Sequence, residues 1–340
     1  MKKHIYYMQL GSKIFLFCLI ALLISCSDDD DDDVTIGNWV ELSDFDGVPR
    51  CDAVAFTIGE KAYFGTGYEE GATRLRDFWS YDPSLNFWYK LDSFPGISRN
   101  GAVGFSINGK GYIGTGYDGE NKLKDFWEYD PETNSWTQIA DFGGTARYGA
   151  VAFSIGDYGY VGTGYDGNYL KDFWRYDPSS GEWEQIVSIG GNKRRDAVAF
   201  TINDKAYICT GIDNGSYEED FWEYDPTSGL WTQLNDIANT TDEDFDDEYT
   251  FTGVERVAFS INGMGYIATG GTGGVGGEVW EYDPITDLWT EKTYFEGSSR
   301  VEAVGFSIGE RGYLATGQNG TYYFDDLWAF DPDDEEDEMD

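Results

Sequence analysis

The sequence contains a single histidine, His4, near the start of the 340-residue chain. A Ser-His-Asp triad needs an imidazole as its general base, and many zinc and copper sites of enzymes are built on histidine. Downstream of residue 4 the chain has no residue that could fill these roles. The absence excludes triad hydrolases and histidine-ligated copper oxidases from the functions that the chain could have.

Positive charge is also scarce, because 23 Lys and Arg residues stand against 63 Asp and Glu residues and give a net charge of −40. Such a chain repels phosphate backbones, so nucleic acid is excluded as a partner. Much of the negative charge lies in three runs, at residues 28–33, 242–248 and 331–340. Runs of this kind are typical of solvated segments.

Cysteine is rare as well. The four cysteines, at positions 18, 26, 51 and 209, show neither a disulfide framework nor CxxC spacing, and only Cys26 stands in a recognisable pattern. Three lysines in the first 13 residues precede an 11-residue apolar run at residues 14–24. Because this run is too short to span a bilayer as a permanent helix, it predicts a signal peptide.

The end of this leader, "LISC", resembles the lipobox of bacterial lipoproteins, in which cleavage precedes a cysteine that is then lipidated. The resemblance implies a signal peptide at residues 1–25, a lipidated Cys26 and an acidic tether at residues 26–37. The following "SDDDDDD" is similar to the acidic export tag of Bacteroidetes lipoproteins and implies an outer-membrane lipoprotein exposed on the cell surface. A secretory signal cut elsewhere is the alternative for the leader, and a solvated spacer is the alternative for the acidic run.

Six copies of Tyr/Phe-Asp-Pro divide the rest of the chain into repeats. Their spacings are 48, 47, 48, 58 and 48 residues, and they begin at Tyr81, Tyr129, Tyr176, Tyr224, Tyr282 and Phe330. Each copy has a tryptophan two residues earlier, and five copies have another seven residues later. The missing partner of the sixth copy is Trp39, so all 12 tryptophans are assigned. A fixed period near 48 residues indicates a solenoid, a propeller or an array.

Each repeat has the pattern of four short strands. Residues 150–155 alternate small and large side chains, Asn108-Gly109 is a two-residue hairpin turn, and the second strand is rich in glycine. The third strand ends at Asp-Pro and the fourth begins at the second tryptophan. Four antiparallel strands of this kind make one blade of a β-propeller. The sixth repeat lacks its fourth strand, so we expect "NWVELSDF" from Asn38 onward to complete the last blade and close the ring.

The sequence "TGYDG", followed by Tyr-Asp-Pro and a tryptophan, resembles the kelch repeat. The resemblance covers residues 38–332 and implies an all-β, six-bladed kelch-type β-propeller, similar to the central domain of galactose oxidase, with an acidic tail at residues 333–340. Several second strands end in Gly-Thr-Gly or Cys-Thr-Gly, where many kelch repeats carry a Gly-Gly pair. This departure concerns the sub-family and not the fold.

The loops between strands fall into a uniform set and a variable set. Third-to-fourth-strand loops such as "DPETNSW" and "DPSSGEW" differ little, whereas second-to-third-strand loops range from "YEEGATRLRD" to "GTGGVGGE". Antiparallel blades place the variable loops and the fourth-to-first connections on one face. Because divergent loops on a rigid scaffold are the usual place of recognition, we expect the binding face there.

An arginine stands just before the first strand in five of the six repeats, at Arg50, Arg99, Arg147, Arg194 and Arg300, while the fifth repeat has Gly253. The kelch resemblance implies that this segment lines the mouth of the central pocket, where a partial ring of guanidinium groups would bind a carboxylate or sulfate. In the alternative, each arginine pairs with a repeated acid and ties neighbouring blades together; these acids are Asp77, Asp125, Asp172, Asp220 and Asp326. Repetition with the scaffold favours the alternative.

Four loop residues are further candidates for ligand binding: Tyr117, Asp118, Tyr165 and Asp166. Tyrosine rings can stack on sugars, although packing within the repeat is the alternative. The insertion at residues 242–248 has the Asp-x-Asp-x-Asp start of a calcium loop but lacks the glycine and glutamate that the loop needs. We therefore predict no metal site and no cofactor.

The sequence predicts a non-catalytic binding module for a glycan or a protein. A carbohydrate-active enzyme of the epimerase or hydrolase type, acting through carboxylates and arginines of the central pocket, is one alternative. A passive adhesion scaffold is another. A deep axial pocket with two unpaired carboxylates would favour the enzyme, and a shallow aromatic rim would favour the binding module.

Overall fold

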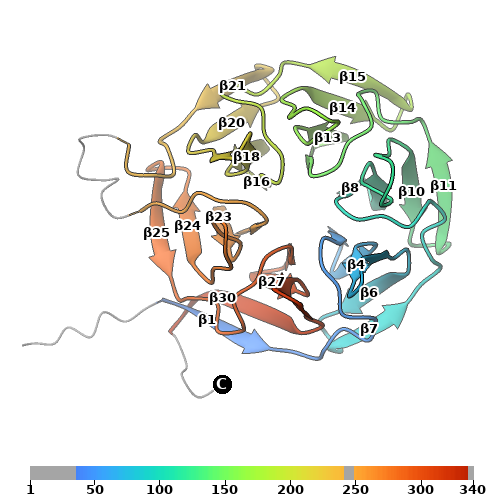
Figure 1. The fold of residues 1–340 in the computed structure, drawn as a ribbon, viewed down its shortest axis with the longest axis horizontal. Helices are drawn as coiled ribbons and strands as arrows, with labels where there is room; N and C mark the ends of the chain where they lie inside the picture. The colour runs from blue at the N-terminus through green and yellow to red at the C-terminus, as the bar shows by residue number, and fades with distance from the viewer. Residues whose placement is uncertain (1–35, 241–248, 336–340) are drawn as a thin grey trace, which may run out of the picture. The chain divides into compact units, whose positions relative to one another are not determined.

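Six four-stranded antiparallel sheets surround a central axis (Figure 1). The computed structural model describes residues 36–240 and 249–335, and within these ranges every regular element is a β-strand. The same ranges hold no helix long and apolar enough to cross a membrane. The predicted lipidation site Cys26, the tether up to residue 35, the calcium-like loop at 242–248 and most of the acidic tail lie outside the described residues, while residues 36 and 37 of the predicted tether belong to the first strand.

In the first five blades the strands run from the axis outward in chain order, and in the sixth the N-terminal strand takes the outermost place. The first three blades are β2 (Val54–Ile58), β3 (Lys61–Gly65), β6 (Phe78–Asp82) and β7 (Phe87–Lys90); β8 (Val103–Ile107), β9 (Lys110–Gly114), β10 (Phe126–Asp130) and β11 (Ser135–Ile139); and β12 (Val151–Ile155), β13 (Tyr158–Gly162), β14 (Phe173–Asp177) and β15 (Glu182–Ile186). The fourth and fifth are β16 (Val198–Ile202), β17 (Lys205–Cys209), β20 (Trp222–Asp225) and β21 (Leu230–Gln233); and β22 (Val257–Ile261), β23 (Met264–Ala268), β24 (Val279–Asp283) and β25 (Leu288–Lys292). The sixth is β26 (Val304–Ile308), β27 (Arg311–Ala315), β30 (Leu327–Glu335) and β1 (Ile36–Glu41).

The prediction that the N-terminal segment closes the ring is confirmed. β1 pairs antiparallel with β30, and Trp39 lies opposite Phe330 in the register. The Trp39 side chain is fully buried and packs its ring 4.7 Å from Phe330 and 4.9 Å from Phe295, measured between ring centroids. The first tryptophan of the described chain therefore fills the place that the sixth repeat leaves open.

Neighbouring blades pack through an aromatic ring against a small residue. Phe105 of β8 lies over Gly159 of β13, where an added Cβ would stand 2.2 Å from the ring. The same relation joins Phe56 to Gly111 and Phe259 to Gly312. The glycines of the second strands are thus explained by close packing between blades.

The Gly-Thr-Gly motif has a backbone role. The threonine after each second strand has a left-handed backbone with φ from 55° to 63°, which is unusual for a β-branched residue; the six are Thr66, Thr115, Thr163, Thr210, Thr269 and Thr316. The glycine that follows also has positive φ, and its N–H donates to the entry segment of the next blade, as Gly116 does to the Arg147 carbonyl at 2.7 Å. The motif therefore ends one strand and joins two blades.

The repeated arginines are fully buried beside this motif. Arg147 donates from Nη1 to the Thr163 carbonyl and to one oxygen of Asp172, and from Nη2 to the other oxygen, each at 2.8 Å. Its guanidinium carbon also lies 4.8 Å from the centre of the Phe142 ring. The equivalent ion pairs are Arg50 with Asp77, Arg99 with Asp125, Arg194 with Asp220, and Arg300 with Asp326.

This placement corrects the expectation of an accessible arginine ring. All five guanidinium groups have no exposed surface, and the acid partners proposed in the alternative interpretation hold them in every case. The physical reason is that a buried charge must be paired to offset the loss of its hydration. Contact with an external anion would require these ion pairs to break.

The fifth blade reaches the same arrangement with a residue that sequence analysis missed. Arg256, three positions after Gly253, donates from Nη1 to the Thr269 carbonyl at 2.8 Å and from Nη2 to Glu278 at 3.0 Å. Glu278 stands where the other blades have an aspartate. The change from aspartate to the longer glutamate at this position is the feature of the sequence that could have indicated an arginine at a different backbone position.

We predict that Arg147→Ala lowers the free energy of unfolding by about 3 kcal/mol, because it leaves Asp172 without its buried partner. Chemical denaturation of the full chain measures this. Arg175→Ala is the matched control in the same blade, since the Arg175–Glu184 pair is exposed and its loss should cost less than about 1 kcal/mol. Equal effects of the two substitutions would contradict the scaffold role of Arg147.

Candidate functional site

A closed ring of backbone hydrogen bonds surrounds the axis on the variable-loop face. Its six members stand immediately before the inner strands: Asp52, Gly101, Gly149, Asp196, Glu255 and Glu302. The N–H of each donates to the carbonyl of the member in the preceding blade, over N···O distances of 2.8 to 3.4 Å. All six have left-handed backbones, with φ from 53° to 60°. The entry segments therefore bring these six positions together around the axis.

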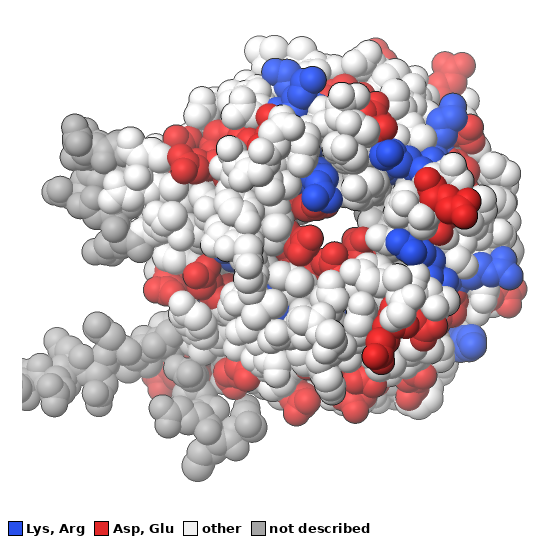
Figure 2. Space-filling view, in the orientation of Figure 1, with Lys and Arg blue, Asp and Glu red and all other residues white. Residues whose placement is uncertain are grey.

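Four of the six ring members carry a carboxylate, and Figure 2 shows acidic side chains at the rim of the central opening. We call Asp52, Asp196, Glu255 and Glu302 the axial acids. Glycine, present in two blades, takes a left-handed backbone without cost, whereas other residues lose roughly 1 kcal/mol or more there. The axial acids are thus held in a conformation that does not favour them, and their side chains face a shared cavity of about 130 Å³.

Polar side chains from neighbouring loops contact three of the axial acids. Asn100 donates to Asp52 at 2.7 Å, and Arg195 forms an ion pair with Asp196 at 3.0 Å. Glu302 accepts hydrogen bonds from the Tyr68 hydroxyl at 2.8 Å and from the Gln318 amide at 2.7 Å; these two donors come from β4 (Tyr68–Glu69) and β28 (Gln318–Asn319). The mouth of the channel therefore combines acceptors and donors.

The environment of the mouth favours protonated carboxyls. Burial, together with the charges of Glu302 and Asp196, raises the pKa of Glu255 to about 7. Burial also raises the pKa of Asp196 to about 6, although Arg195 opposes the shift. The pKa of Asp52 is raised well above its usual range by burial and then by Glu302. Three of the four axial acids therefore hold their protons to a higher pH than ordinary carboxyls.

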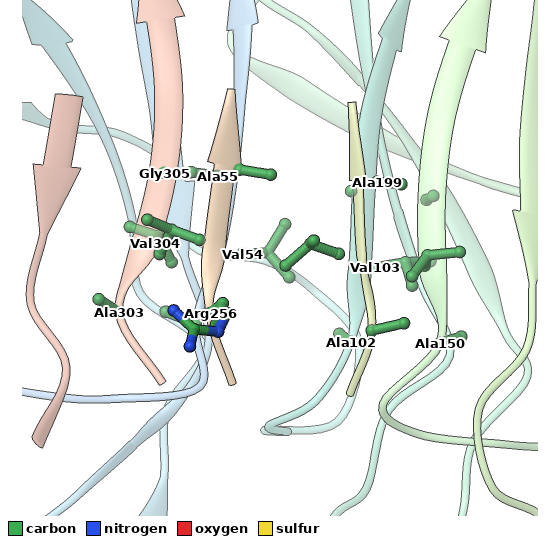
Figure 3. A pocket seen from close by; sticks show the side chains of 18 residues that line it. Val54, Ala55, Ala102, Val103, Ala150, Ala199, Arg256, Ala303, Val304 and Gly305 are labelled. Carbon is green, nitrogen blue, oxygen red and sulfur yellow. The ribbon is translucent and has the colours of Figure 1, made fainter. Parts of the chain in front are cut away.

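Beyond the axial acids, toward the middle of the propeller, the channel is lined by small apolar residues (Figure 3). The part next to the mouth has a volume of about 190 Å³. It is lined by alanine, valine and glycine of the six inner strands and the residues just before them, with Arg256 as the one charged residue. The part toward the opposite face, also about 190 Å³, includes a serine or threonine from each inner strand. Charged side chains are therefore concentrated at the mouth, whereas hydroxyl groups line the part toward the opposite face.

The thiol nearest the mouth is not a nucleophile. Cys51 is buried, and burial together with Glu302 raises the pKa of its thiol well above the usual value. The thiolate is the reactive form of cysteine, so this residue stays inert near neutral pH.

The four loop residues named by the sequence lie beside the mouth. Tyr117 and Tyr165 are half-buried, and each contacts the Tyr148 ring, at centroid distances of 5.6 and 5.7 Å. Asp118 and Asp166 accept backbone N–H groups within their own loops, which holds the pKa of Asp118 below its usual value. The tyrosines thus remain available for contact, whereas the aspartates stabilise turns.

Sequence analysis missed the axial acids. Each stands two residues after the repeated arginine or, in the fifth blade, after Gly253. An alignment of the repeats would have revealed the signal, because this position alternates only between acids and glycine. A position that holds only acids or glycine is unusual, and this restriction distinguishes it from the other loop positions.

We predict that the free energy of unfolding falls as the pH rises from about 4.5 to 7. Glu255 has a folded-state pKa of about 7, above an ordinary value of about 4.3, so the folded state binds more protons in this window. The charged groups that face it are Asp52, Asp196, Glu302, Arg195 and Arg256. Thermal melting at pH 5 and pH 8 should show a smaller difference for Glu255→Gln than for the unmodified chain.

The control is Glu132→Gln, which changes an exposed acid on a turn of the second blade. It should leave the pH dependence of melting unchanged. An identical pH profile for Glu255→Gln and the unmodified chain would contradict the assignment.

Comparisons with known proteins agree with this architecture. Residues 38–195 match the model of the KLHDC2/KLHL20/DRC7 Kelch-repeats domain, and residues 193–237 match the Kelch motif. No curated protein matches the chain. A similar solved structure, entitled "Structure of YjhT", is 18% identical, with a TM-score of 0.69 over 84% of this chain and 95% of the other, which shows likeness of fold alone. The repeats, the six closed blades and these matches establish the chain as a six-bladed kelch-type β-propeller.

Proposed function

We propose that the chain is a lipid-anchored, non-catalytic binding module of the outer membrane, exposed on the cell surface, and that it binds a glycan on its variable-loop face. The kelch propeller supports a binding or scaffold role in general. The lipid anchor rests on the sequence around Cys26, which lies outside the described residues. The glycan rests on the side chains of the loop face.

The observation that carries the glycan proposal is a continuous row of tyrosine rings beside the channel mouth. Tyr117, Tyr148, Tyr165 and Tyr169, which we call the tyrosine row, have consecutive centroid distances of 5.6, 5.7 and 5.2 Å. All four rings are half-buried, so each has an exposed part. Rigid aromatic rings with hydroxyl groups suit sugars, which present both apolar faces and hydroxyls.

The mouth supports binding without enclosure. The cavity at the axial acids measures about 130 Å³, below the roughly 300–1,000 Å³ of pockets that enclose a small ligand. It can take the hydroxyls of one end of a chain, while the remainder lies across the tyrosine row. The axial acids accept hydrogen bonds from Tyr68, Asn100 and Gln318, and their carboxylate oxygens have further lone pairs that can accept from such hydroxyls.

A second candidate is a carbohydrate-active enzyme, and the axial acids favour it. Glu255, with a pKa of about 7, and Asp196, with a pKa of about 6, are both suited to donate and accept protons near neutral pH. They share one cavity at the mouth. The two candidates differ in whether the bound glycan is chemically altered.

We predict that Tyr165→Ala weakens glycan binding by about three- to tenfold, the amount expected from the loss of one aromatic contact. The measurement is a glycan and polysaccharide array on the full chain, read for binding and for released product in the same wells. Tyr89→Ala is the matched control, because Tyr89 is an exposed tyrosine on the outer strand β7.

Binding that depends on Tyr165 and not on Tyr89, without released product, supports the binding module. Released product that disappears in Glu255→Gln, while binding remains, would replace the module with the enzyme. If no glycan on the array binds, the glycan proposal is wrong and a protein partner is favoured.

We also predict that Cys26→Ser abolishes lipidation. The modified thiol is the attachment point of the acyl chains, so labelled palmitate should enter the unmodified chain and not the variant when each is produced in a bacterial host. Cys209→Ser serves as the control, because Cys209 is buried in the fourth blade and should not affect labelling. Equal labelling of the Cys26 variant would contradict the anchor.

A further inference from the structure

The exposed and half-buried cations of the variable-loop face are confined to one part of the ring. Figure 2 shows Lys and Arg side chains over the half of this face that carries the first three blades and the entry to the fourth. We call these residues the basic arc: Arg74, Arg76, Lys122, Lys124, Lys171, Lys193 and Arg195. On the described loops of the fifth and sixth blades, the arginines that enter the inner strands are buried and paired. The face is therefore electrically polarised.

Most cations of the basic arc have no acid partner, although acids outnumber cations in the chain by 63 to 23. Within the described residues no carboxylate forms an ion pair with Arg74, Arg76, Lys122, Lys171 or Lys193; Lys124 and Arg195 have such a pair. Five exposed or half-buried cations elsewhere each have a carboxylate within 3.0 Å, namely Lys61, Lys110, Arg175, Lys205 and Arg311. The exception, Lys90, lies over the Trp79 ring.

One position of the repeat shows that the charge is local. The residue three places before the first tryptophan of the repeat is Arg76, Lys124 and Lys171 in the first three blades, but Glu219, Gly277 and Asp325 in the last three. In the sixth blade this residue, Asp325, lines a cavity of about 730 Å³ together with Glu41, Asp44 and Glu296, which are also acids. The scaffold tolerates either sign here, so the cations are not required by the fold.

The basic arc adjoins the tyrosine row. The Arg74 guanidinium lies 5.3 Å from the centre of the Tyr117 ring, and Lys122 Nζ lies 5.6 Å from that of Tyr165. The Arg195 guanidinium lies within 6 Å of both Tyr148 and Tyr165. Cations and aromatic rings thus follow the same path across the second and third blades.

We infer that the ligand of this face is an anionic polysaccharide, whose carboxylate or sulfate groups contact the basic arc while its sugar rings lie on the tyrosine row. The inference rests on the proposed glycan-binding function and names the class of glycan. Cations without an acid partner can exchange their hydration for contact with an anion, and their distribution over successive blades offers several contacts to a polymer with repeated charges. Tyrosines between the cations favour a sugar polymer over an acidic peptide.

The polymer should avoid the axis itself. The axial acids would repel its charged groups wherever they are ionised, whereas Arg195, paired with Asp196, separates them from the tyrosine row. The chain of sugars is therefore expected to run along the first three blades, with hydroxyls rather than carboxylates toward the mouth.

The test uses the full chain and four immobilised or titrated probes: polygalacturonate, chondroitin sulfate, neutral dextran and poly-L-glutamate. Lys122→Ala/Lys171→Ala removes two cations that have no acid partner; both side chains are half-buried, so the melting temperature of the variant is measured beside its affinity. Lys110→Ala/Lys205→Ala is the control of equal charge, because both lysines begin second strands and pair with glutamates. Affinity is measured at low and high salt.

We expect at least one of the two anionic polysaccharides to bind, with affinity that falls as salt rises. The basic-arc variant should lose about tenfold in affinity and the control less than about twofold. Poly-L-glutamate should bind much more weakly. Equal binding of poly-L-glutamate and polysaccharide would overturn the inference in favour of an acidic protein.

Failure of the inference and failure of the proposed function give different results. If neutral glycans bind in a Tyr165-dependent way and the basic-arc variant binds as well as the unmodified chain, the inference is wrong and the glycan function stands. If no glycan, neutral or anionic, binds the full chain, both are wrong.

Discussion

The whole propeller depends on one buried ion pair, repeated around the ring. In each blade a guanidinium group spans a threonine carbonyl and a carboxylate, and its backbone is held by the loop of the preceding blade. A buried guanidinium without partners would be very costly, so the pair fixes three segments of chain at once. The left-handed threonine exists because it turns its carbonyl toward this charge. Fold and motif follow from one electrostatic requirement.

This requirement separates the positions that must repeat from those that are free to change. Arginine, threonine and aspartate are tied to one another, and the fifth blade restores the contact through Arg256 and Glu278 when the usual arginine is missing. The ring position next to them has no side-chain partner that repeats in every blade, because its backbone alone closes the hydrogen-bonded ring. Its side chain can therefore be an acid or be absent, and chemistry can accumulate there without disturbing the blades.

The fold could be predicted from sequence because its signals are periodic. Tryptophan occurs at two positions per repeat, and the sixth repeat lacks the second one. Because Trp39 was the one tryptophan left over, the closure of the ring by β1 could be predicted. The site was harder. The arginines were the more visible pattern, yet pattern alone does not tell whether a cation is covered, which depends on the loops that pack over it. The axial acids were overlooked because two of the six positions are glycine, and only the three-dimensional ring relates Asp52 to Glu255.

The pairing of β1 with β30 also sets the order in which the chain can be completed. Residue 36 lies opposite residue 335, so β1, which is synthesised before the other strands, cannot pair until β30 has been synthesised. Contacts so distant in sequence are slow to form, because a long loop must close before any of them is gained. Until the last residues arrive, the sixth blade presents an open sheet edge, which is the part of such a protein most prone to pair with other chains. Folding must therefore leave the ring open until β30 is available to pair with β1.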